Sequence, residues 1–374
     1  MQYLDGGDTH TYMKDSITLF QALKSNPSHF FQLITGIEWQ QEELQHYYRQ
    51  LRTNAEPGYG NIFNNSMLFV RLNTILCCFS LGYYSIHVIF MCFLSLIGLI
   101  ALYKVITTTF NPVTFILINT LPGLLLWGSM MLKEPLVIFL LGLSIYHFQR
   151  SLRNINSGNV IGFLVCFSFL MLMKTFVTLL LFPALTAWII NTLWNKKWLP
   201  VFTLTISSFI LIIIILSTID SRFNVFQAMH NQQIVFLKFA VYYQANSLIE
   251  LIPFSPDALS VIKRSPEALL TAFRPFPGEA KNFLQFIAAM ENIYILLLLT
   301  FLISKAKMVN LKYKPEVAIC IATGLFILIV AAFTTPVIGA LVRIKVPGIL
   351  LLIAGLSAGI TNGWAKDGSN SFNL

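Results

Sequence analysis

Charged side chains interrupt several apolar stretches of this sequence, and their chemistry is the first clue to a function. Lys133 and Glu134 are adjacent inside LPGLLLWGSMMLKEPLVIFLLGLSIYHF, with Pro135 directly after them. A charge at the centre of a bilayer costs roughly 2.5–3.5 kcal/mol on insertion scales, so the pair marks a turn at a membrane face. Proline suits the first turn of the next helix. The pair is either the polar turn of a helical hairpin or part of a polar cavity for a charged substrate.

Further basic residues lie between or beside apolar segments, where membrane proteins rarely have them. Lys174 joins two apolar segments without a polar linker, Arg274 precedes a later apolar run, and Arg343 and Lys345 lie in a short turn between prolines. Lys174 could snorkel to the interface, and Arg343 and Lys345 could be ordinary interfacial anchors. If all of them lie on the outer face, against the positive-inside tendency, they indicate an anionic ligand such as phosphate or pyrophosphate.

Carboxylates are expected on the same face. Asp5 and Asp8 lie in LDGGDTHTY, and Glu291 lies about two turns into a late apolar run. Such groups could supply a general base or hold a divalent metal ion, for which Asp5 and Asp8 are the candidate ligands. The bland alternatives are a solvated turn for Asp5 and Asp8 and a structural ion pair between Glu291 and Lys281 or Arg274.

The composition fixes the class of protein. Hydrophobic residues make up 56% and charged residues 11% of the 374 residues, and the mean hydropathy is +0.70. Apolar runs of about 20 residues recur, which predicts an all-α, polytopic integral membrane protein. The net charge of +9 lies mostly in short loops, where it sets topology and does not indicate nucleic-acid binding. The five cysteines lie in apolar segments without metal-ligand spacing.

The chain divides into five regions. We expect an outer-face helical segment over 1–65, an interfacial helix over 66–82 that is too short to span, and six transmembrane helices over 83–219. An outer-face cap follows over 220–285, and 286–374 holds three more transmembrane helices and a cytoplasmic tail. The predicted spans, about nine in number, are 84–105, 112–131, 135–149, 158–173, 175–194, 199–219, 286–303, 316–335 and 346–362.

The basic residues of the short loops set the orientation. The face that collects most of them should be cytoplasmic, which puts the N-terminal region outside and the C-terminus inside. An outer N-terminal region of this length usually follows a signal anchor, so a first transmembrane helix is expected upstream of Met1. The cytoplasmic set is Lys104, Arg150, Arg153, Lys196, Lys197, Lys305, Lys307, Lys312, Lys314 and Lys366.

Four stretches resemble bacterial members of the C-type glycosyltransferase superfamily, which are membrane enzymes that use polyprenyl-phosphate-linked sugars. They are LDGGDTHTY, PGLLLWGSMMLKEPL, LMLMKTFVTLLLFPAL and LVRIKVPG. The resemblance implies that Asp5 or Asp8 is the catalytic base and that Lys174 and Arg343 contact the lipid phosphate. The Asp-Gly-Gly-Asp spacing departs from the adjacent carboxylates of the family motif.

The resemblance implies transfer of a sugar from a polyprenyl-phosphate carrier to a glycan, lipid or protein acceptor at the outer interface of the bacterial inner membrane. One alternative is an enzyme like the O-antigen polymerases, which would rely on Arg222, Arg264 and Arg274 of the outer loop. Another is a transporter or flippase of a lipid-linked sugar, for which internal repeats and broken helices near the bilayer centre would be expected.

Overall fold

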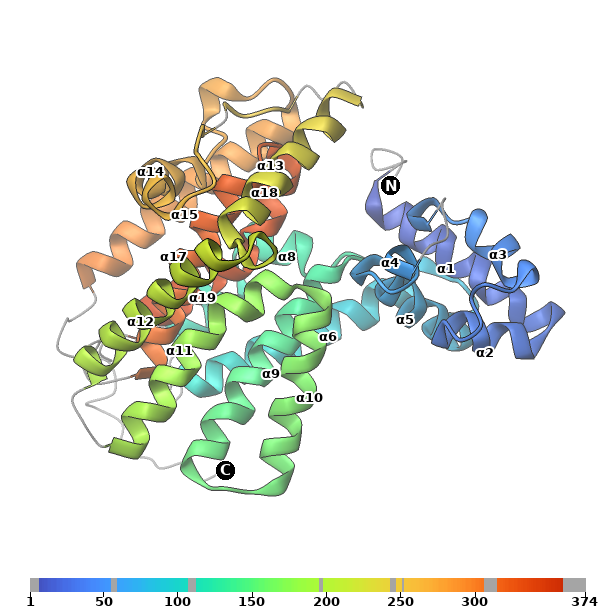
Figure 1. Ribbon diagram of the computed structural model, residues 1–374, viewed down its shortest axis with the longest axis horizontal. Coiled ribbons are helices and arrows are strands. Elements are labelled where there is room, and N and C mark those ends of the chain that lie inside the picture. The colour runs from blue at the N-terminus through green and yellow to red at the C-terminus, as the bar shows by residue number, and fades with distance from the viewer. Residues whose placement is uncertain are drawn as a thin grey trace. The chain divides into compact units, whose positions relative to one another are not determined.

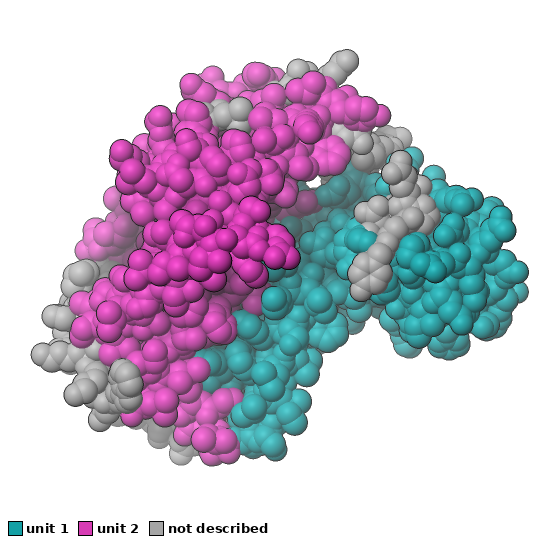
Figure 2. Space-filling model, in the orientation of Figure 1, with its two compact units in different colours: residues 1–101, 125–148, 156–175 teal, residues 102–124, 149–155, 176–374 magenta. Residues whose placement is uncertain are grey.

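The computed structural model describes residues 7–54, 59–106, 112–194, 198–242, 247–250, 252–305 and 315–358. These residues are helical except for turns, connections and one isolated antiparallel bridge between Leu248 and Val337 (Figure 1). The chain forms two compact units, coloured separately in Figure 2. Unit 1 comprises residues 1–101, 125–148 and 156–175, and unit 2 comprises residues 102–124, 149–155 and 176–374.

The N-terminal part of unit 1 is a small helical bundle. Its core lies between the first and last helices, where the ring of Tyr12 meets that of Phe69 with centroids 5.1 Å apart. Asp15 of the first helix is buried and accepts hydrogen bonds from the backbone N–H groups of Arg52 and Thr53. These bonds fix the segment at Arg52 and Thr53 to that helix. The helices are α1 (Asp8–Ser25), α2 (Pro27–Thr35), α3 (Glu42–Arg49), η2 (Arg52–Asn54), α4 (Tyr59–Ile62) and α5 (Asn65–Ser80).

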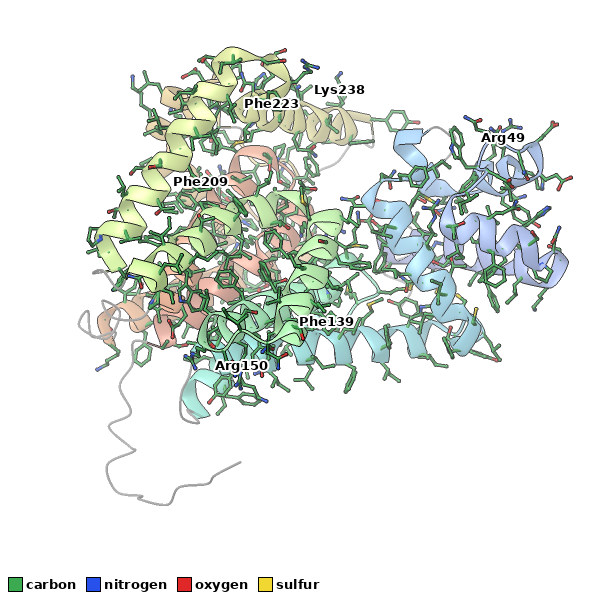
Figure 3. All side chains as sticks on the ribbon, turned by 60° about the horizontal axis from the view of Figure 1, so that its bottom comes forward. Arg49, Phe139, Arg150, Phe209, Phe223 and Lys238 are labelled. Atoms are coloured by element: carbon green, nitrogen blue, oxygen red, sulfur yellow. The ribbon has the colours of Figure 1, made fainter. Side chains whose placement is uncertain are left out.

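Three long apolar helices begin in or belong to unit 1: α6 (Tyr84–Ile106), α9 (Lys133–Arg153) and α10 (Ser157–Met173). Pro135 lies in the first turn of α9, as the sequence predicts. Glycine lets α6 and α9 approach closely. A Cβ atom on Gly142 would collide with the backbone of Gly98, and one on Gly98 would collide with the backbone of Ile138 and Phe139, the latter labelled in Figure 3. Membrane helices commonly pack through such small residues.

Gly142→Ala is therefore expected to force α6 and α9 apart and to lower the thermal unfolding midpoint in detergent. The added methyl group meets backbone atoms, which cannot rotate away, so overpacking should cost about 1–3 kcal/mol. Gly339→Ala is the matched control, because Gly339 is also helical but a Cβ there meets nothing within 4 Å. Equal midpoints for the two variants would contradict this account of the helix contact.

Unit 2 holds most of the remaining helices, and its core is formed by α17 and α19, where Gly324 and Gly348 again allow close backbone approach. The predicted outer cap is largely helical, which suits its mixed polar and apolar sequence. The elements are α7 (Pro112–Asn119), α8 (Pro122–Trp127), α11 (Thr175–Trp194), α12 (Trp198–Ile219), η3 (Ser221–Phe223), α13 (Val225–Tyr242), α14 (Ala258–Thr271), η4 (Pro277–Glu279), α15 (Phe283–Lys305), α17 (Pro315–Thr334), α18 (Ile338–Ile344) and α19 (Val346–Ser357).

Six helices of the described residues are long and apolar enough to cross a membrane, and the bent pair α18–α19 makes a seventh if it counts as one span. The predicted class, an all-α protein with several membrane-spanning helices, is thus supported, whereas the predicted count of nine is not confirmed. The run 112–131 is divided into two short helices, because Pro122 begins a new helix after Thr120 and Leu121. The helix α10 has 17 residues and falls just below the length of a full span.

Candidate functional site

Lys174 and Glu134 form a buried ion pair in unit 1. The Lys174 Nζ atom lies 3.3 Å from Glu134 Oε1, and the two side chains are 12% and 4% exposed. Lys174 terminates α10 and α11 begins at the next residue, so the chain has no linker at this point, as the sequence indicates. The tight junction directs the lysine into protein, where the carboxylate at the start of α9 offsets its charge.

Lys133 lies beside this pair in sequence but has different partners. Its Nζ atom donates hydrogen bonds to Asn65 Oδ1 and Ser66 Oγ, both at 2.9 Å, and lies 5.8 Å from the centre of the Tyr12 ring. These three partners are uncharged.

The contact with Tyr12 brings an acidic residue into this neighbourhood. Asp8 is the first residue of α1 and precedes Tyr12 by four positions. Residues at this spacing lie on the same face of a helix, with Cβ atoms about 5–6 Å apart. Asp8 is an exposed residue.

A groove of about 610 Å³ adjoins the cluster on the side of Asn65. Asn65 links the two features, since it accepts from Lys133 and donates to the backbone carbonyl of Met173, at 3.4 Å, next to Lys174. The lining is polar at some positions and apolar at others, which suits an amphiphilic ligand. The lining residues are Phe63, Asn64, Asn65, Ser168, Met171, Leu172 and Thr175.

Lys345 belongs to unit 2 and is buried, with 2% of its surface exposed. Its Nζ atom donates to the Ala272 carbonyl at 2.9 Å and to Asn292 Oδ1 at 2.5 Å. The Asn292 amide also donates to the Pro275 carbonyl, and the Glu291 carboxylate attracts the Lys345 ammonium. Lys345 therefore ties the α18–α19 junction to α15 and to the end of α14, rather than facing the membrane surface as an anchor.

Arg274 is also engaged within unit 2. Its Nη2 atom lies 2.6 Å from Glu279 Oε1, and its Nη1 atom lies 4.0 Å from Glu250 Oε2. Burial raises the pKa of Glu279, but the hydrogen bonds from Arg274 and from the Phe276 N–H group, with the Arg274 charge, outweigh it and hold this pKa below its usual value. The carboxylate therefore stays ionised beside the guanidinium.

The other predicted residues are placed as follows. Asp5 lies outside the described residues. Glu291 accepts a hydrogen bond from the Gly123 N–H group at 2.6 Å, an interaction that the sequence does not reveal. Arg343 lies in α18 of unit 2, whereas Lys174 belongs to unit 1. The structure thus brings together Lys133, Glu134, Lys174 and the start of α1, and it gathers Lys345 and Glu291 separately.

Asn65 and Ser66 were not identified from the sequence as candidate residues. The signal for them is the run Asn64–Asn65–Ser66 directly before an apolar segment, which is typical of a helix N-terminus, and Asn64 indeed caps α5 through the Met67 N–H group. The two residues after this cap, Asn65 and Ser66, lie in the first turn of α5 and accept hydrogen bonds from Lys133. Among the described residues, no group of three His, Cys, Asp or Glu side chains could hold a metal ion.

In comparisons with known proteins, no protein-family model, no curated protein and no solved structure matches the chain.

Proposed function

We propose that the chain is a membrane glycosyltransferase that takes a sugar from a polyprenyl-phosphate carrier and transfers it to an acceptor hydroxyl at the membrane–water interface. The observation that carries the proposal is the contact of Lys133 with the Tyr12 ring, since Asp8 lies one helical turn before Tyr12 in α1 and the amphiphilic groove adjoins Lys133 through Asn65. A lipid phosphate needs a cationic site with apolar surface next to it, and unit 1 offers both.

The roles follow from the chemistry of the transfer. Asp8 accepts the proton of the acceptor hydroxyl, whose oxygen attacks the anomeric carbon of the sugar. The bond between that carbon and the phosphate oxygen breaks, and the leaving polyprenyl phosphate keeps the bonding electron pair. Lys133 and Lys174 stabilise this negative charge, with Lys174 held in place by Glu134. Arg343 of unit 2 has no role in this proposal.

The polymerase-like alternative relies on arginines of unit 2 that do not line this groove. Each arginine expected of a polymerase-like enzyme lies in an ion pair: Arg222 with Asp220, Arg264 with Glu267, and Arg274 with Glu279.

Donor binding tests the proposal directly. In nanodiscs, the protein should bind a polyprenyl phosphate more tightly than the matching polyprenol, and Lys133→Gln should weaken only the former by about 1.5–3 kcal/mol, the value of one charge-assisted hydrogen bond. Lys14→Gln is the matched control, since Lys14 is an exposed lysine of the same unit. Equal affinity of the wild type for the phosphate and the alcohol would refute the proposal.

The proposed site requires the N-terminal bundle on the outer face of the bacterial inner membrane. A membrane-impermeant thiol reagent should then label cysteines placed at the exposed positions Glu42 and Lys263 in intact cells, and should label one at Lys305 only after permeabilisation. Labelling of Glu42→Cys only after permeabilisation would put Asp8 on the wrong side of the membrane.

A further inference from the structure

The inward face of α5 carries polar as well as apolar side chains. Three of the polar ones, Arg71, Asn73 and Thr74, are buried and have hydrogen-bond partners. The Arg71 Nε atom donates to the Leu33 carbonyl at 3.0 Å, and Asn73 Oδ1 lies 3.0 Å from the His87 ring. The Thr74 hydroxyl donates hydrogen bonds to the carbonyls of Val70 and Ser16. These hydrogen bonds offset part of the cost of burying the polar groups.

The outward face of α5 is an unbroken apolar stripe. Its members are spaced by four, three, one and three residues, which places them on one face of a helix. Ile75 is 42% exposed and Phe79 is 79% exposed, and the others are half-buried. A surface helix of a soluble domain would carry polar and charged residues on this outward face. The stripe consists of Leu68, Leu72, Ile75, Leu76 and Phe79.

The stripe leads directly into a membrane-crossing segment. After α5, the chain turns through Leu81 and Gly82, which have φ angles of 51° and 83°, and α6 starts at Tyr84. Leu81 in the turn and Tyr83 directly after it are 71% and 66% exposed. Since α6 is long and apolar enough to span a bilayer, the end of the stripe must lie within a few residues of the membrane surface.

We infer that α5 lies in the membrane surface with its apolar stripe against the acyl chains. The partner of this face of unit 1 is therefore the lipid bilayer. An amphipathic helix in this position sinks its apolar face about 5–10 Å into the boundary between headgroups and acyl chains. The helix α1 packs on the other side of α5 and shows exposed polar residues such as Lys14 and Gln21, so unit 1 has a water-facing side as well. The inference depends on exposure and chain continuity, and holds whether or not the protein transfers sugars.

Spin labels on the full-length protein in lipid vesicles test the inference. Labels are attached to cysteines at Leu72, Ile75 and Phe79 on the stripe, and at Lys14 and Gln21 on α1 as matched controls. The exposed native Cys78 and Cys92 are replaced by alanine in every variant, and a label-free sample of this background measures any signal from the buried cysteines. Collisions of each label with dissolved oxygen, which enriches in the bilayer, are compared with collisions with a water-soluble nickel chelate.

The stripe positions should favour oxygen severalfold over the nickel chelate, and the α1 positions should favour the nickel chelate. Nickel access at Ile75 and Phe79 equal to that at Lys14 would overturn the inference, because the stripe would then face water. Protection of the stripe from both reagents would also overturn it, since the face would then be covered by protein.

Discussion

Glu134→Gln is expected to destabilise unit 1 by about 3–5 kcal/mol, because it leaves the buried Lys174 ammonium without the carboxylate that offsets its charge. The geometry of the pair is the reason for so large an effect. Neither side chain is more than 12% exposed, so water cannot replace the lost partner fully. Lys174→Met should have a similar effect by leaving the carboxylate behind.

The double variant separates this explanation from a general packing defect. Glu134→Gln combined with Lys174→Met removes both charges and should be more stable than either single variant, since buried pairs replaced together are often nearly neutral. Unfolding in mixed detergent micelles, followed by helical circular dichroism, gives the four free energies of the cycle. Additive losses in the double variant would show that the two side chains act independently.

The exposed pair Arg264–Glu267 of α14 supplies the control. Its side chains are 49% and 46% exposed, and their atoms are 3.0 Å apart, so geometry is matched while burial differs. Glu267→Gln should change the unfolding free energy by less than about 1 kcal/mol. A loss as large as that of Glu134→Gln would mean that burial does not decide the strength of these pairs.

Lys345→Met is expected to destabilise unit 2 by about 3 kcal/mol or more. Two opposing effects must be weighed. The methionine avoids burying a charge, which is favourable, but it leaves the Ala272 carbonyl and the Asn292 amide oxygen without their donor, and hydrogen bonds to a charged group are worth about 1.5–3 kcal/mol each. The Glu291 carboxylate also loses the cation that attracts it. The lost hydrogen bonds and the lost charge attraction should therefore outweigh the gain from removing a buried charge.

Lys263→Met in α14 is the matched control, because Lys263 is an exposed lysine of the same unit, and it should leave stability unchanged within about 0.5 kcal/mol. Thermal unfolding of both variants in one detergent provides the measurement. A Lys345→Met protein as stable as the wild type would contradict the structural role, and would return Lys345 to the residues that could bind a ligand.

The sequence predicts the architecture well where local composition decides it. Apolar runs predict α6, α12, α15 and α17, and Pro135 predicts the start of α9, because hydropathy and proline geometry act within a few residues. The predicted run 112–131 failed as one span, since apolarity alone does not show that Pro122 starts a separate helix.

The candidate site is harder to predict, because its contacts join distant parts of the chain. The adjacent charges of Lys133 and Glu134 predict a polar feature but not that the two side chains have different partners, Asn65 and Lys174. A buried lysine and an exposed one look alike in sequence, so Lys345 could not be recognised as part of a structural network. Whether a lysine is buried depends on tertiary packing, which a hydropathy pattern does not contain.

Asn65 also sets an order of events during synthesis. Its amide bonds the carbonyl of Met173, 108 residues later, and its carbonyl oxygen holds Lys133. At roughly 5–20 residues per second, the ribosome needs about 5–20 s to add that length of chain. The groove therefore cannot assemble until α10 has been made. A nascent chain stalled before Met173 would carry α1 and α5 but no complete site.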